Sequence, residues 1–250
     1  MTSLSTPVQE VPDLGRSEAA VLAAAENDRF VALVETLDEA QWSEPTDCSD
    51  WDVRALVSHV VGAMEANASI PEFVHQLRAG KKAAGDRPDI DGMTEVQVRE
   101  RADLGPEQLT RRLAVIAPKA AKGRKRVPAL IRGRSMKVEV DGVMEPWRLG
   151  YLFDVILTRD VWMHRVDITR ATRRPLELDG EHDGRLVAGV VAEWASRHGQ
   201  PFILHLEGLA GGNYATDDPG ETITIDAVEF CRTVSGRAPG SGLLTQEVPF

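Results

Sequence analysis

Apolar residues recur at three- and four-residue intervals through much of the first 175 positions, as on one face of an α-helix. In the first such stretch Phe30, Val34 and Leu37 share a face. The pattern predicts four helices, at residues 17–37, about 51–77, 106 to about 121, and about 146–172. Gly80 is expected to end the second of them.

The pattern changes after residues 173–175, which read Arg-Arg-Pro. Residues 186–194 continue at helical spacing, whereas residues 202–207 and 221–225 alternate or are β-branched, which is typical of strands. Asp226 is placed to cap a last short helix. The sequence therefore predicts an α+β protein with a disordered N-terminus at 1–15, a four-helix bundle at 16–174 and a small α/β domain at 175–250.

Two polar residues lie within the apolar face of the fourth predicted helix. At about 100° per residue, Asp160 and His164 fall among Leu149, Phe153, Ile156, Leu157 and Ala171, with Tyr151, Thr158, Arg165 and Thr169 on other sides. A carboxylate and an imidazole are thus expected to point into a core. Because an unpaired buried carboxylate is costly, an arginine, a shared proton or a metal ion must compensate it.

The second predicted helix supplies a third candidate ligand. His59 lies among small residues, roughly opposite a polar side formed by Arg54, Ser58 and Glu65, so it points inward. Two histidines and one carboxylate suit Zn²⁺, Ni²⁺ or Fe²⁺ and leave coordination positions open for chemistry.

The spacing of these residues alone leaves other interpretations open. An Asp-x-x-x-His pair is common on helices, and a buried hydrogen bond or ion pair is the simpler explanation. Asp167 is placed either to accept a hydrogen bond from an imidazole or to pair with Arg170 or Arg174.

Composition narrows the classes of partner. A net charge of −10 and a pI near 5.1 argue against nucleic acid and an anionic membrane surface, which favours small molecules or proteins. No stretch approaches the roughly 20 apolar residues of a membrane helix, residues 1–15 lack the apolar core of a signal peptide, and we expect a cytoplasmic protein. Residues 119–137 carry eight cations and no acidic residue, which indicates either a solvated loop or an attraction for an anion.

Cysteine is scarce in the chain. Cys48 and Cys231 are too few and too far apart for a disulfide framework or a cysteine metal site. Cys48 precedes the His59 helix, where it is either a reactive thiol or, more simply, a small loop residue.

Three segments, in order, resemble one protein family. They are WSEPTDCSDWDVRALVSH at 42–59, RDVWMHRVD at 159–167, and EFCRTVSGRAPG at 229–240 with VPF at 248–250. Together they resemble the mycothiol-dependent maleylpyruvate isomerase family, within the DinB-like four-helix metalloproteins. The resemblance implies a DinB-like bundle followed by a small, sterol-carrier-like domain.

The same resemblance implies a chemistry. His59, Asp160 and His164 would hold a divalent metal, by resemblance zinc, and the metal would bind the thiol mycothiol. The thiolate would add to the cis double bond of maleylpyruvate, and rotation and elimination would give the trans product. Arg237, in a Ser-Gly-Arg turn, resembles an arginine of the family's C-terminal domain, which implies that it faces a cleft between domains and meets an anionic substrate; the alternative is an ion pair with a surface carboxylate. Arg99 and Arg101 are further candidate cations, which no motif distinguishes. Asp160 is one methylene shorter than the family's typical glutamate.

Three functions therefore stand beside one another. The first is a metal-dependent enzyme that uses a low-molecular-weight thiol for isomerisation or for thiol transfer to an anionic or electrophilic small molecule. The second is a non-catalytic ligand-binding protein with a degenerate metal site, and the third is a metal-dependent hydrolase. The sequence does not specify the oligomeric state.

Overall fold

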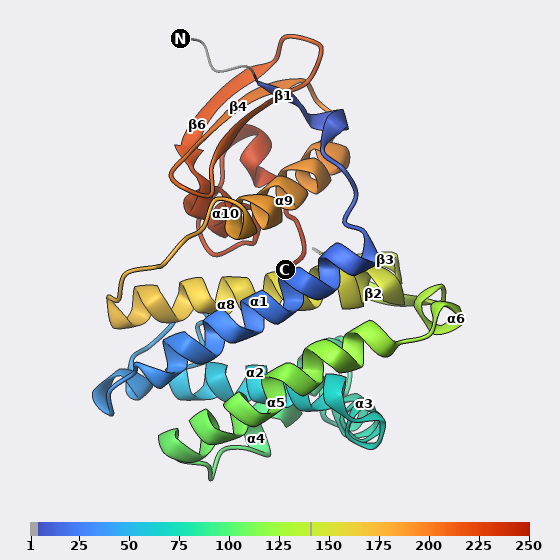
Figure 1. The fold of residues 1–250 in the computed structure, drawn as a ribbon. Helices are drawn as coiled ribbons and strands as arrows, with labels where there is room; N and C mark the ends of the chain where they lie inside the picture. The colour runs from blue at the N-terminus through green and yellow to red at the C-terminus, as the bar shows by residue number, and fades with distance from the viewer. Residues whose placement is uncertain (1–4, 141) are drawn as a thin grey trace. The chain divides into compact units, whose positions relative to one another are not determined.

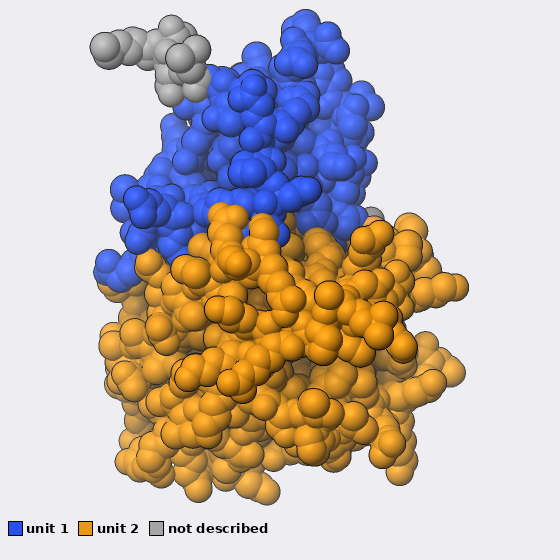
Figure 2. Space-filling model, turned by 45° about the vertical axis from the view of Figure 1, so that its right-hand side comes forward, with its two compact units in different colours: residues 1–14, 176–250 blue, residues 15–175 orange. Residues whose placement is uncertain are grey.

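The computed structural model describes residues 5–140 and 142–250, which form two compact units. The helical unit is Gly15–Pro175 (Figure 1). The second unit combines Leu176–Phe250 with the described residues that precede Gly15 (Figure 2). The expected fold class, a helix bundle followed by a small α/β part, is confirmed.

Four long helices share the core of the helical unit: α1 (Arg16–Glu35), α2 (Val53–Ala68), α5 (Pro106–Arg126) and α8 (Leu157–Thr172). Phe30 of α1, Leu56 of α2, Leu113 of α5 and Ile168 of α8 are all fully buried within one apolar cluster. The predicted stripes thus face one another. The 3₁₀ turn η2 (Ala40–Ser43) adds Trp42 to the same cluster.

The second predicted helix is wrong in its length, because it is two helices. Ser69 is extended between α2 and α3 (Ile70–Ala84), and its hydroxyl accepts from the Glu72 N–H as the cap of α3. Asp52 caps α2 by accepting a hydrogen bond from the Ala55 N–H at 2.8 Å. Gly80 does not end a helix.

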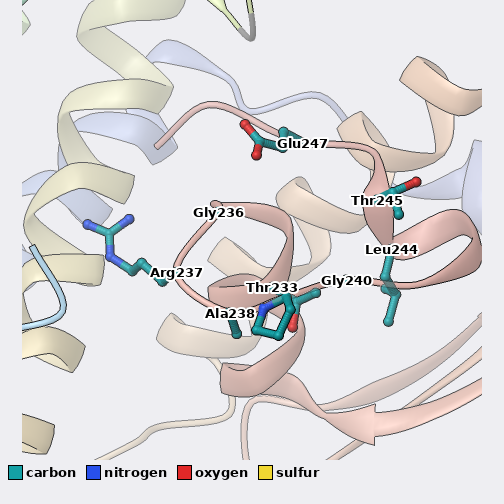
Figure 3. A pocket seen from close by; sticks show the side chains of 9 residues that line it. Thr233, Gly236, Arg237, Ala238, Gly240, Leu244, Thr245 and Glu247 are labelled. Carbon is teal, nitrogen blue, oxygen red and sulfur yellow. The ribbon is translucent and has the colours of Figure 1, made fainter. Parts of the chain in front are cut away.

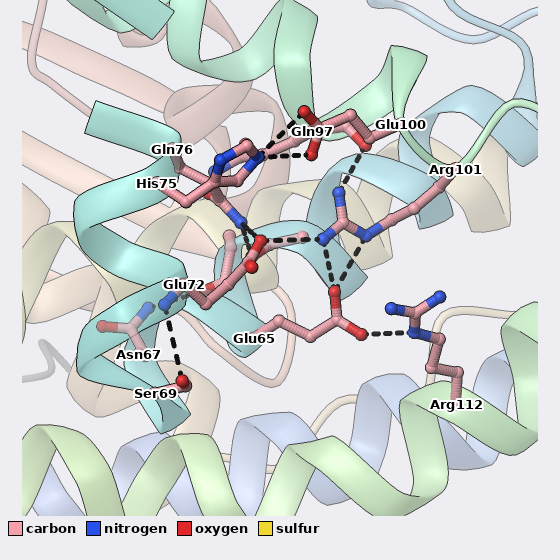
Figure 4. Close-up of polar contacts among 12 residues, drawn as sticks. Glu65, Asn67, Ser69, Glu72, His75, Gln76, Gln97, Glu100, Arg101 and Arg112 are labelled. Atoms are coloured by element: carbon pink, nitrogen blue, oxygen red, sulfur yellow. Dashed lines mark hydrogen bonds and ion pairs between the residues drawn. The ribbon is translucent and has the colours of Figure 1, made fainter. Parts of the chain in front are cut away.

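Gly80 instead permits the close approach of a helix that the sequence pattern missed, α4 (Asp89–Arg99). A Cβ atom at Gly80 would lie 2.8 Å from the Met93 Cα. The α3–α4 pair is tied to α2 by a buried polar network (Figure 4). Arg101, 3% exposed, pairs with Glu65 and Glu72, and Glu65 also binds Arg112.

The predicted outer side of α2 is therefore partly wrong. Ser58 is 2% exposed, and the Glu65 carboxylate belongs to the buried network, while Arg54 is exposed. Helices α3 and α4, which the pattern did not resolve, cover the side of α2 that carries Glu65.

The fourth predicted helix begins later than the pattern indicated. A hairpin of β2 (Ser135–Val140) and β3 (Val143–Arg148) follows the short helix α6 (Ala129–Arg132). The one-turn helix α7 (Leu149–Tyr151) and the π-helix η3 (Leu152–Ile156) then lead into α8. Because a π turn interrupts the α-helical phase, the residues before and after it do not form the one continuous stripe we predicted.

The second unit is a four-stranded sheet with helices α9 (His182–His198) and α10 (Ala227–Val234) on one face (Figure 1). Trp194 is fully buried, with ring centroids 4.9 Å from Phe202 and 5.4 Å from Phe230. The 3₁₀ turn η4 (Gly242–Thr245) follows α10. The strands, in sheet order, are β1 (Thr6–Pro7), β5 (Gly212–Ala215), β4 (Phe202–Glu207) and β6 (Glu221–Asp226).

The expected disorder of residues 1–15 is wrong for most of the described part of that segment. Thr6 and Pro7 pair in parallel with Tyr214 and Ala215, and the 3₁₀ turn η1 (Val8–Glu10) buries Val8. Backbone pairing and one apolar anchor order this stretch. Among the described residues, none of the helices combines the length and apolarity that crossing a membrane requires.

Candidate metal centre

Helices α2 and α8 bring together the three predicted ligands. His59 Nε2 lies 3.6 Å from Asp160 Oδ2, and His164 Nε2 lies 3.3 Å from Asp160 Oδ1. The two imidazole rings are nearly perpendicular, with centroids 5.2 Å apart. One nitrogen or oxygen from each residue lies within 4.8 Å of the others.

Helix α8 is buried on nearly every side, which explains how its polar residues are fixed. The Arg165 guanidinium donates through Nε and a terminal nitrogen to the two carboxylate oxygens of Glu26 in α1, at 2.7 and 3.2 Å. Thr158, Arg165 and Thr169, which we predicted away from the core face, are all buried. The bidentate pair sets the rotation of α8 against α1.

Asp167 orients the His164 ring. Its Oδ2 lies 3.0 Å from His164 Nδ1, and Cys48 Sγ lies 3.6 Å from the same oxygen. Of the two roles that the sequence left open for Asp167, the structure shows the imidazole acceptor. Arg170 pairs with Asp47 instead. With Nδ1 bonded to the carboxylate, Nε2 of His164 is the nitrogen that faces Asp160.

Trp51 forms one wall of the site, a role that the hydrophobic pattern did not indicate. Its ring centroid lies 5.0 Å from that of His59 and 6.3 Å from that of His164. The resembling segment, which contains both Cys48 and Trp51, was the one signal that placed them near His59.

The electrostatics of the three residues are strongly coupled. Burial raises the pKa of the Asp160 carboxyl, but the His164 and His59 imidazoles outweigh it and hold this pKa well below its usual range. Burial lowers the pKa of His164, but Asp160, Asp167 and Cys48 outweigh it and raise that pKa well above its usual value. Without a metal, the site is therefore an ion pair of aspartate and imidazolium.

The donor set fits a divalent metal. His59 Nδ1 is buried and has no hydrogen-bond partner within residues 5–140 and 142–250, whereas Nε2 of the same ring faces Asp160 at 3.6 Å. Asp160 is the more open ligand, with 22% of its side chain exposed against 7% for His59 and 5% for His164. Three nitrogen and oxygen donors with one accessible side match a zinc site that keeps a position open.

Arg237 lies in the second unit, in the turn after α10. Its neighbour Gly236 has φ +77°, a conformation that favours glycine. Arg237, Thr233 and Glu247 are among the residues that line a hollow of about 400 Å³ (Figure 3). Its facing an anionic substrate remains a prediction.

Two further candidate cations belong to ion pairs. Arg101 is buried against Glu65, and Arg99 pairs with Glu95 on the surface at 3.0 Å.

The fold and the site together define a helix-bundle protein with a candidate two-histidine, one-carboxylate metal centre. Residues 23–169 match the family model described as the mycothiol maleylpyruvate isomerase N-terminal domain. Since this match spans more than half of the chain, the protein belongs to that family, as the sequence motifs indicated.

Solved structures show the same fold over nearly the whole chain. A crystal structure of the mycothiol-dependent maleylpyruvate isomerase is 17% identical, with a TM-score of 0.58 over 98% of this chain and 98% of that chain. A mutant of such an isomerase is 14% identical, with a TM-score of 0.58 over 93% and 92%. A search of curated proteins finds no match.

Proposed function

We propose that this protein is a metal-dependent enzyme that uses mycothiol to isomerise a maleylpyruvate-like substrate, with His59, Asp160 and His164 as the metal ligands. The observation that carries the proposal is the convergence of these three donors from α2 and α8 in a member of this family. The fold likeness to the isomerase structures over nearly the whole chain is consistent with it.

The ligands divide the work according to their surroundings. His59 and His164 are buried, and Asp167 fixes the direction in which His164 presents Nε2. Asp160 is partly exposed, so an incoming small molecule approaches from its side. A divalent ion, which we propose is zinc, would supply Lewis acidity that keeps a bound thiol deprotonated near neutral pH.

The shorter carboxylate is compatible with this role. Asp160 stands where the resemblance leads us to expect glutamate, yet both of its oxygens lie within 3.6 Å of an imidazole nitrogen. Its reach is therefore sufficient to meet both histidines. We propose Arg237 as the cation that binds a carboxylate of the substrate.

The chemistry also implies a compartment. Cys48 and Cys231 are thiols rather than disulfide partners, and reduced cysteines are typical of a reducing environment. We therefore propose that the protein acts in the cytoplasm, where a low-molecular-weight thiol is maintained in its reduced form.

The test is the conversion of maleylpyruvate to its trans isomer by zinc-loaded protein, followed by ultraviolet absorbance with and without mycothiol. We expect turnover that requires the thiol, is lost in Asp160→Asn, and is retained in His75→Gln. His75 is a suitable control because it is half-exposed and pairs with Glu100 on α4's side of the unit. Absence of turnover in the zinc- and thiol-supplied wild type would contradict the isomerase proposal.

Two other outcomes lead to different conclusions. Equal turnover without thiol would refute a thiol cofactor and favour a metal-activated water. Consumption of mycothiol into a stable adduct of the substrate, without release of the trans isomer, would replace isomerisation by thiol transfer at the same site.

A further inference from the structure

The π-helix before α8 controls the direction of the candidate ligands. The Leu157 N–H is directed to the Leu152 and Val155 carbonyls, in place of the Phe153 carbonyl that an α-helix would use. A π turn holds about one residue more than an α turn, which rotates everything after it by about 100°. Asp160 is four residues beyond this turn, so its direction depends on whether the turn is kept.

Two arginines from the basic segment at 119–137 bind this turn. Arg124, at the end of α5, donates to the Phe153 carbonyl through Nε at 2.9 Å and through a terminal nitrogen at 2.5 Å. The same terminal nitrogen lies 2.6 Å from the Thr158 hydroxyl. Arg132, on α6, pairs with Asp154 inside the π turn.

These arginines are not part of a solvated loop. Arg124 is 6% exposed and Arg132 is 8% exposed, and Arg132 also donates to the Arg124 carbonyl at 3.4 Å. Burial and the nearby Arg132 lower the pKa of the Arg124 guanidinium to about 10, against the opposing effect of Asp160. Arg124 therefore remains charged at neutral pH and interacts electrostatically with Asp160.

The Phe153 carbonyl explains why an arginine is required. It is a buried acceptor whose usual α-helical donor is turned elsewhere, and leaving such a group unpaired is costly. A guanidinium supplies two N–H groups in one plane and holds the carbonyl at a fixed angle. A lysine carries the charge but lacks this planar fork.

We propose that Arg124 is a positioning residue of the metal centre: it holds the π turn through the Phe153 carbonyl and thereby fixes the rotation of α8 that directs Asp160 and His164 toward His59. The role rests on the proposed metal site, since Arg124 acts through the ligands. Arg165, bound to Glu26, is the second anchor of the same helix.

The test compares Arg124→Lys and Arg124→Met with Arg126→Met, which removes an exposed arginine from the same helical turn. Zn²⁺ affinity is measured by competition with a chromophoric chelator, and ligand geometry by the visible absorption of bound Co²⁺, which depends on coordination geometry. We expect Zn²⁺ to bind about 10- to 100-fold more weakly in Arg124→Met. In Arg124→Lys we expect an altered Co²⁺ spectrum, and in Arg126→Met no change.

The outcomes separate this role from the metal site itself. If wild-type protein binds Zn²⁺ and both Arg124 variants match Arg126→Met in affinity and spectrum, the positioning role is refuted and the metal site stands. If the wild type binds neither Zn²⁺ nor Co²⁺, both the proposed metal site and the positioning role of Arg124 are refuted. Should Arg124→Met not fold, Arg124→Lys decides, because a purely stabilising arginine would leave the Co²⁺ spectrum of the folded variant unchanged.

Discussion

Replacing Asp167 with asparagine removes one charge from beneath the metal centre while keeping the shape of the side chain. Asp167 is fully buried, and its Oδ2 lies 3.0 Å from His164 Nδ1. The asparagine oxygen can still accept the Nδ1–H, but it no longer carries the charge that makes His164 a stronger ligand. We therefore expect Asp167→Asn to fold and to bind metal more weakly.

The size of the effect follows from the geometry. Loss of a group that supports a metal-bound histidine weakens metal binding about 10- to 100-fold, which is about 1.4 to 2.8 kcal/mol. The complete burial of Asp167 places its substitution toward the upper end of that range, since water cannot replace the carboxylate. The bond to Asp167 also raises the pKa of His164. In the variant this pKa is lower, so protons compete less strongly with the metal for the His164 nitrogen than they do in the wild type.

The assay is Zn²⁺ affinity at pH 6 and pH 8.5, measured against a chelator, with Asp50→Asn as a control for the loss of an exposed carboxylate near the start of α2. We expect the larger loss at pH 8.5, because at pH 6 the lower pKa of His164 in the variant offsets part of it. An affinity equal to that of wild type at pH 8.5 would refute the proposed role of Asp167, as would an equal loss in Asp50→Asn.

Two further predictions concern stability. In metal-free protein, the raised pKa of His164 stabilises the fold, and this stabilisation is complete below about pH 6.5 and is lost as the pH rises through the folded-state pKa. The lowered pKa of Asp160 also stabilises the fold, and this stabilisation is present above about pH 3.9 and is lost as the pH falls through the folded-state pKa. Urea unfolding should therefore show greatest stability from this pair between about pH 4 and 6.5, and a pH dependence unchanged in Asp160→Asn would contradict this. Arg101→Met should lower the free energy of unfolding by about 3 kcal/mol, because the partly buried Glu65 then keeps only Arg112 as a partner. The control Arg99→Met removes an exposed arginine and should lower the free energy of unfolding by under about 0.5 kcal/mol. Equal effects of the two substitutions would refute the importance of the buried pair.

The sequence predicted the parts of the fold that depend on local periodicity. Phe30 and Val34 were recognisable as core positions because their spacing places them on one face of the first predicted helix, and both are buried in the apolar cluster. The position of His59 was found in the same way, since α2 is regular from Val53 onward.

Other features depend on contacts between distant segments. Cys48 and Asp167 are 119 residues apart, so no local pattern indicates that they meet at His164. The π turn has no sequence signature either, because it is held by Arg124, 29 residues before Phe153. We predicted a continuous helix there. That prediction placed Asp160 and His164 correctly on one face, because both follow the π turn, but it did not place them correctly relative to the residues before the turn.

Some errors had signals that were present in the sequence. Ser69 followed by Pro71 and Glu72 is a typical helix start, and it marks the break between α2 and α3. The sequence between the residues of β2 and those of β3 reads Asp-Gly at 141–142, a dipeptide whose occurrence between alternating residues favours a hairpin. The run of cations at 119–137 favoured a solvated loop instead.

The most direct test of the central claim is elemental analysis of the protein purified without chelators, as wild type and as Asp160→Asn and His164→Ala. Our account predicts on the order of one zinc ion per wild-type chain and a small fraction of that in both variants. A wild-type protein without stoichiometric metal would contradict the account, and variants that retain the metal would show that His59, Asp160 and His164 are not the ligand set.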